Sequence, residues 1–166
     1  MYTDRKVFVE EWKMETELTL KIFSAVPDNK MEEKVNENVR SLGFMAWHIT
    51  QTLTEMCNKA GIFSEDKLEG YQVPSTMKDI SEIYKKYSDI IVAEIENNWT
   101  DESLSEQVNM YGEMWEKRQV LNVLIKHQIH HRAQMTVVMR LLDVKVPGIY
   151  GPSKEEWAQF GMEPAK

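Results

Sequence analysis

Four histidines are the residues of this 166-residue chain whose type and spacing could do chemistry. His127 and His131 lie four residues apart in a stretch that predicts a long helix, so both side chains leave the same face. Both point within about 25° of the direction set by the apolar residues of that helix, whereas His130 points about 85° away, to the edge or into solvent. Two imidazoles at this spacing can reach one metal ion, as in the zinc-binding helix of metalloproteases. The glutamate of that motif is missing, because Gln128 follows His127, so only its ligand geometry applies.

His48 is the candidate for a third ligand. It lies on the flank of the apolar stripe of an earlier predicted helix, a position that points into a corner between helices, where bundles build metal sites. His48, His127 and His131 together predict a three-nitrogen site for one divalent ion. A water at its fourth position would mark a catalytic rather than a structural zinc site. The alternative is that these histidines are core residues with hydrogen-bonded ring nitrogens.

Other polar side chains could assist such a site. Glu15 interrupts the apolar stripe of the first predicted helix, where a carboxylate is costly unless paired. It is a candidate general base, histidine partner or substrate contact, or else a glutamate that reaches solvent. Gln134, one turn beyond His131, is placed to orient a ligand or cap a pocket, whereas Arg132 is expected to project away from the core. Cys57 is not a convincing nucleophile, since nothing near it predicts a lowered pKa.

Four amphipathic stretches must position these residues. Apolar side chains recur at three- and four-residue steps over about residues 4–25, 37–59, 76–98 and 114–143, which predicts four helices. Residues 100–113 show no clean period, and Trp157 and Phe160 suggest that the tail docks on the body. We therefore expect one all-α domain over residues 1–166, an up-and-down four-helix bundle with a long last helix and a docked C-terminal tail.

The composition narrows the function classes. Hydrophobic residues make up 42% and charged residues 28%, as in an ordered globular chain. The net charge of −7 argues against a nucleic-acid partner, because phosphate neutralisation needs a basic patch. No apolar run approaches the ~20 residues of a membrane span, and the N-terminus lacks the apolar core of a signal peptide, so we expect no membrane partner. The lone Cys57 excludes an intramolecular disulfide and fits a reducing, cytoplasmic location.

Two segments carry a family resemblance. HQIHHRAQMTVVMRLLDVKVPGIYGPSKEEW, residues 127–157, resembles the C-terminal signature of the DinB-like (YfiT-type) superfamily, with its His-x-x-x-His-Arg-x-Gln core and Tyr-Gly-Pro-Ser tail. GFMAWHIT, residues 43–50, resembles the single-histidine helix of that family. The resemblance spans essentially the whole chain and implies a four-helix bundle, usually a homodimer. It also implies one divalent ion, often nickel or zinc, on the three positions that correspond to His48, His127 and His131.

A divalent ion on three neutral imidazoles would lower the pKa of a bound water or thiol towards neutrality. Water predicts hydrolysis, whereas a low-molecular-weight thiol predicts attack on a small electrophilic substrate such as an epoxide or a halide. The resemblance favours the thiol, because some members look like thiol S-transferases that use bacillithiol or mycothiol, and another branch isomerises maleylpyruvate with a thiol cofactor. Two other hypotheses stay open: a non-catalytic metal-binding or interaction protein, and a metal-free helical dimer.

Overall fold

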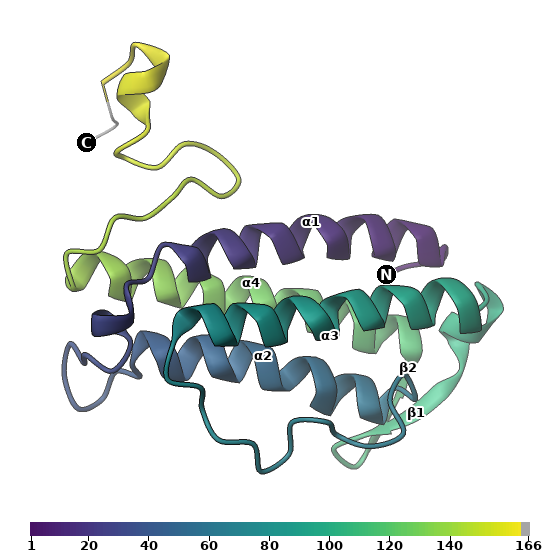
Figure 1. Cartoon of the computed structure of the whole chain (residues 1–166). Helices are drawn as coiled ribbons and strands as arrows, with labels where there is room; N and C mark the ends of the chain where they lie inside the picture. Colours follow the sequence, from purple (N-terminus) through teal and green to yellow (C-terminus); the bar gives the residue numbers. More distant parts are fainter. Residues whose placement is uncertain (164–166) are drawn as a thin grey trace.

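The computed structural model of the chain describes residues 1–163, so the last three residues of the predicted domain and tail lie outside the described residues. Most of the described chain is helical, and the prediction of an all-α four-helix bundle is confirmed (Figure 1). The four long helices are α1 Arg5–Ser24, α2 Leu42–Lys59, α3 Met77–Asn98 and α4 Lys117–Leu141. The connections and the described part of the tail contain three short 3-10 helices, at Asp28–Lys30, Glu102–Ser105 and Trp157–Phe160.

The starts of α1, α2 and α3 follow capping residues. Side-chain oxygens of Asp4, Ser41 and Thr76 each accept a hydrogen bond from a backbone N–H that the first turn of a helix leaves free. The prediction that the second helix begins near Glu37 is wrong, because Ser41 Oγ accepts the Phe44 N–H at 3.2 Å and the helix begins after this cap.

The connection between α3 and α4 contains a small hairpin that the sequence pattern did not predict. Strand β1 spans Gln107–Met110 and pairs antiparallel with β2, Glu113–Glu116. Tyr111 and Gly112 form the two-residue turn with φ of 56° and 92°, the left-handed conformation that such tight turns require. The predicted start of the last helix near Met114 is therefore wrong, because that residue lies in β2.

The order of the helices around the bundle decides which side chains can meet. Helix α1 packs on α3 and α4, and α2 packs on the same two helices. The long loop over residues 60–76 carries the chain back along the bundle, so α2 and α3 run in the same direction (Figure 1). The bundle thus departs from the predicted up-and-down order in two ways: α2 and α3 are parallel, and α1 packs on α3 and α4 rather than on α2 (Figure 1). The consequence for function is that α2 lies directly against α4.

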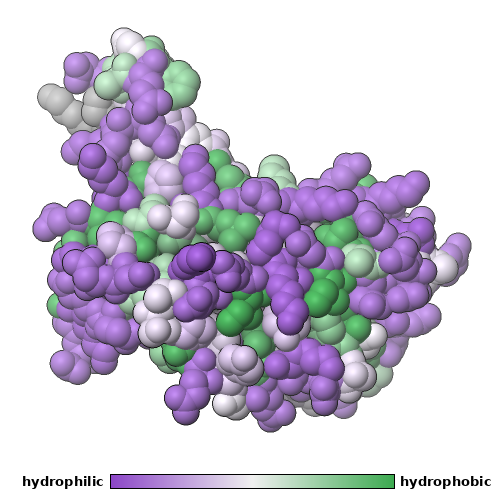
Figure 2. Space-filling view, in the orientation of Figure 1, coloured by the Kyte–Doolittle hydropathy of each residue, from purple (hydrophilic) through white to green (hydrophobic). Residues whose placement is uncertain are grey.

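Large apolar side chains fill the interior of the bundle. Phe8, Trp12, Phe23 and Tyr84 are fully buried within it. On the face seen in Figure 2, hydrophilic side chains dominate and hydrophobic ones show only in separate places. Within residues 1–163, no helix is both long and apolar enough to cross a membrane.

The tail after α4 contacts the bundle through its first part. Lys21 Nζ donates to the Gly148 carbonyl oxygen at 2.7 Å, and the Tyr150 hydroxyl donates to the Glu15 carboxylate. The segment beyond extends away from the helices (Figure 1), and Phe160 in it is 61% exposed. The tail is thus attached by the buried side chains of Val144 and Val146, by the polar contacts of Gly148 and Tyr150, and by an ion pair between Glu155 and Arg140 of α4. Phe160, one of the two aromatic residues that suggested the docking, adds no buried contact.

Candidate metal centre

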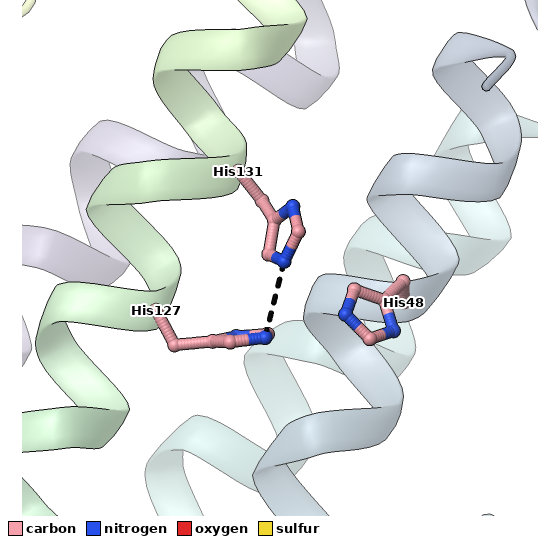
Figure 3. Close-up of side chains that lie close together, drawn as sticks. All are labelled: His48, His127 and His131. Atoms are coloured by element: carbon pink, nitrogen blue, oxygen red, sulfur yellow. Dashed lines mark hydrogen bonds between the residues drawn. The ribbon is translucent and has the colours of Figure 1, made fainter. Parts of the chain in front are cut away.

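Three histidine side chains converge where α2 lies against α4. His48 comes from α2, whereas His127 and His131 come from successive turns of α4, and their rings point toward one another (Figure 3). The ring centroids are 4.4 Å apart for His127 and His131, 5.0 Å for His48 and His127, and 4.6 Å for His48 and His131. One nitrogen from each ring lies within 4.8 Å of the other two. These three histidines could therefore bind one metal ion.

Hydrogen bonds orient the two rings of α4. His131 Nδ1 lies 2.8 Å from Gln134 Oε1, and His127 Nδ1 lies 3.5 Å from Thr52 Oγ1. The Thr52 hydroxyl donates its own hydrogen to the Ile49 carbonyl oxygen at 2.9 Å, so towards His127 it accepts. These two contacts favour the tautomers with the hydrogen on Nδ1, in which both imidazoles turn the lone pair of Nε2 to the centre of the cluster.

The distance between the two Nε2 atoms fits a shared ion. They lie 3.1 Å apart, which the dashed line in Figure 3 marks. Two nitrogens bound at ~2.0–2.1 Å to one ion are roughly 2.9 Å apart at a right angle and roughly 3.3–3.4 Å apart at the tetrahedral angle. Without an ion, this contact is a hydrogen bond in which one ring donates from Nε2. With both hydrogens on Nδ1, a cation between the two nitrogens would remove the repulsion of their lone pairs. The tautomers and the spacing thus both match a metal site.

Electrostatics keep these imidazoles neutral, as metal ligands must be. Burial lowers the pKa of His127 to about 4, with further lowering by the positive charges that His131, His48 and His130 carry when protonated. Burial also lowers the pKa of His48, assisted by His131 and Arg40. The pKa of His131 is lowered by burial too, although its hydrogen bond to Gln134 acts in the opposite direction. At neutral pH all three rings therefore have a free lone pair.

A groove beside the cluster gives access to it. The groove has a volume of about 570 Å³ and reaches His131 and Gln134 at one side. Its other walls are mostly apolar, and it is lined there by Asn38, Val39, Arg40, Met45, Val137, Val138 and Leu141. A small organic molecule in this groove would lie next to the histidine cluster, as expected for a binding site.

Glu15 lies in a different cluster. It is 2% exposed, pairs with the equally buried Arg132, and accepts a hydrogen bond from the Tyr150 hydroxyl at 2.8 Å. Arg132 also donates to Thr19 Oγ1 at 3.1 Å. The expectation that Arg132 projects away from the core is wrong, because α4 buries a second face against α1 and the pairing compensates the charge there.

Two other predicted placements can be compared with the structure. His130 is exposed, as its angle on the helix indicated. Cys57 is fully buried, and burial raises the pKa of its thiol well above the usual range, which keeps the thiol protonated and unreactive.

The sequence analysis missed two residues near the cluster. Thr52 lies one turn beyond His48 on the same helix flank, and that i, i+4 spacing was the available signal for its contact with His127. Arg40 lies before α2 and carried no signal, because its position depends on the loop that leads into the helix.

An all-α bundle with three converging histidines beside a groove defines the class of protein: a helical bundle with a candidate metal centre between α2 and α4. The sequence pattern of the DinB family matches residues 1–165, and the chain belongs to that family. It is 35% identical over 159 residues to the uncharacterized protein YrdA of Bacillus subtilis (strain 168), covering 96% of this chain and 95% of that protein.

Two solved structures are similar to the bundle. One is a DinB-like protein from Bacillus cereus ATCC 10987, with a TM-score of 0.81 and 32% identity over 90% of this chain and 100% of that one. The other is the DinB-like protein YjoA from Bacillus subtilis, with a TM-score of 0.69 and 18% identity over 88% of this chain and 99% of that one. The second similarity shows the fold alone.

Proposed function

We propose that this protein is a metal-dependent enzyme that uses one divalent ion, zinc or nickel, to activate a low-molecular-weight thiol against a small electrophilic substrate. The observation that carries the proposal is the convergence of His48, His127 and His131 beside a groove large enough for a small organic molecule. Three neutral imidazoles leave the charge of a bound ion undiminished, and such an ion lowers the pKa of a thiol or water towards neutrality. The thiol, rather than water, is inferred from the family to which the chain belongs.

The residues around the cluster have separate tasks in this proposal. His48, His127 and His131 hold the ion, and Gln134 and Thr52 are positioning residues that keep the hydrogen of two rings on Nδ1. Glu15 is also a positioning residue, because its carboxylate is fully engaged by Arg132 and Tyr150 and holds α4 next to His131. For a halide substrate, the thiol sulfur would form the bond to carbon as the carbon–halogen bond breaks, with the thiol proton passing to solvent and the halide leaving.

Metal content of untagged protein is the first test. After reconstitution with zinc, nickel, iron or manganese, we expect about one ion per chain in the wild type and in His130→Ala, and a strong loss in His127→Ala. His130→Ala is the matched control, because it removes an exposed histidine from the same helix. Less than about half an ion per chain in the wild type would refute the metal site.

A reaction panel is the second test. Metal-loaded protein is incubated with cysteine, glutathione or bacillithiol and a fluorogenic chlorobimane, and in parallel with nitrophenyl esters in the absence of thiol. We expect thiol conjugation that depends on the metal and disappears in His127→Ala. Ester cleavage without thiol turnover would instead identify a hydrolase, and a full metal site without either reaction would indicate a non-catalytic metal-binding protein.

A further inference from the structure

The groove next to the histidines differs in charge from the rest of the molecule. The chain has 27 acidic residues against 20 basic ones, yet none of the acidic side chains within residues 1–163 lines this groove. Among the residues that the structure describes, Arg40 is the one charged residue that lines it. The neighbouring groove, which shares Arg40, is by contrast also lined by Asp28, Glu32 and Glu37. Of these two grooves, the one at the candidate metal centre is therefore the better suited to an anion.

Arg40 is held close to the cluster by the residues around it. Its guanidinium carbon lies 4.9 Å from the centroid of the Phe44 ring, and that ring stacks with His48 at 6.4 Å. Arg40 lies in the loop over residues 31–41, and a 2.8 Å hydrogen bond from the Gly43 N–H to the Met31 carbonyl oxygen connects the start of this loop to α2. A Cβ atom at Gly43 would lie 3.2 Å from that oxygen, so the close approach depends on glycine.

The guanidinium of Arg40 is free to bind a ligand. None of the ion pairs formed within residues 1–163 includes it. Its charge acts on both neighbouring rings, since it contributes to the lowered pKa values of His48 and His131. An ion held by three neutral histidines would add to the same positive field.

We propose that the groove binds a small organic carboxylate that also carries a donor atom for the metal, with Arg40 holding the carboxylate. The inference rests on the proposed function, because the donor atom needs an ion at the three histidines. One guanidinium balances one negative charge, which favours a carboxylate over a dianionic phosphate, and its planar fork fits carboxylate oxygens. The apolar body of the ligand would pack on Val137, Val138 and Leu141.

Two probes that differ only in charge test this inference. Cobalt-loaded protein is titrated with 3-mercaptopropionate and with its neutral methyl ester, and the visible absorption of the cobalt centre reports binding of the thiol. We expect the wild type to bind the carboxylate at least about tenfold more tightly than the ester, and high salt to narrow the difference. Arg40→Gln should bind both probes equally, and Arg40→Lys should keep part of the preference.

Lys34→Gln is the matched control, since it removes a positive charge from the same loop at a residue that lines only the neighbouring groove. It should retain the preference, and the cobalt content should be unchanged in all variants. Equal binding of the two probes by the wild type, or a preference that survives in Arg40→Gln, overturns the inference and leaves the metal centre standing. A wild type that binds no cobalt overturns the proposed function and this inference with it.

A second copy of the chain is the competing occupant of the groove, because Val137 and Leu141 are each 59% exposed. Light scattering of the wild type and of Val137→Glu distinguishes this case. A dimer that becomes a monomer in Val137→Glu would assign the groove to the dimer interface and overturn the inference. An unchanged mass in Val137→Glu would exclude the dimer interface as the occupant, which is the result that the inference requires.

Discussion

Replacing Glu15 by leucine should destabilise the protein strongly, because it leaves the Arg132 guanidinium buried without a negative charge. Both side chains are 2% exposed, and Arg132 donates to the Glu15 carboxylate from the neighbouring helix α4. Tyr150 also donates to this carboxylate, at 2.8 Å, so the tail loses a contact as well. We expect the free energy of unfolding to fall by about 3–5 kcal/mol, the usual cost of breaking a buried ion pair from one side.

The loss of stability in Glu15→Leu comes from the buried charge that is left unpaired. Removing both partners should therefore restore much of the free energy of unfolding. In Glu15→Leu/Arg132→Met no charge remains in the cluster, and we expect the double variant to be at least about 2 kcal/mol more stable than Glu15→Leu alone. Asp89→Asn is the control. Its exposed partner Lys85 lies 2.6 Å away, and such pairs contribute less than about 1 kcal/mol.

Urea denaturation followed by circular dichroism measures these differences, provided that the slope of the transition stays constant among the variants. For a domain of this size each kcal/mol corresponds to about 2–4 °C in the melting temperature, which gives a second readout. A loss below about 1 kcal/mol in Glu15→Leu would show that solvent reaches the pair. A double variant that loses the sum of the two single losses would show that the side chains do not interact.

Three further predictions concern the candidate metal centre and the side chain of Cys57. Alanine at His48, His127 or His131 should weaken metal binding by more than about 100-fold, and Gln134→Ala should weaken it by roughly tenfold. Competition with a chelator measures these affinities, and equal losses in all four variants would contradict the assigned roles. The metal-free protein should lose stability as the pH falls from about 6.5 towards 4, because the pKa of His127 is about 4 in the folded chain and near 6.5 when unfolded, so the unfolded chain binds more protons in that range. The dependence of the urea midpoint on pH should flatten in His127→Gln, and a slope unchanged by this substitution would refute the assignment. Cys57 should react with a thiol reagent only at the rate of unfolding, since the side chain is fully buried; rapid modification of the folded protein would contradict this placement.

The histidine cluster could be predicted because helical periodicity is a local property. The four-residue step between His127 and His131 places both rings on one face of any helix, whatever the partner. His48 lies on the flank of its own helix, so its ring joins the other two once that helix is assumed to pack on the helix of His127 and His131. Which helix packs on α4 depends on the order of the helices around the bundle, and α2 does lie against α4.

The hairpin and the loop before α2 could not be predicted by the same reasoning. Strands β1 and β2 have four residues each, too few to show a period, and Tyr111 is not a residue that favours the left-handed turn it forms. The start of α2 was predicted too early because the apolar stripe does not show where the backbone N–H groups find their first partner. The Ser41 cap decides that, and it leaves Arg40 outside the helix.

The wrong prediction for the Arg132 side chain shows that one apolar direction does not describe a bundle helix completely. Helix α4 packs on both α2 and α1, so it buries two faces about one residue step apart. His131 points to α2, and the next residue, Arg132, points to α1, where Glu15 and Thr19 receive it. The buried ion pair thereby fixes the rotation of α4 about its own axis at the level of the histidines. A rotation that moved His131 away from His48 would also pull Arg132 out of its pair, so the polar cluster at α1 stabilises the geometry of the candidate metal centre at α2.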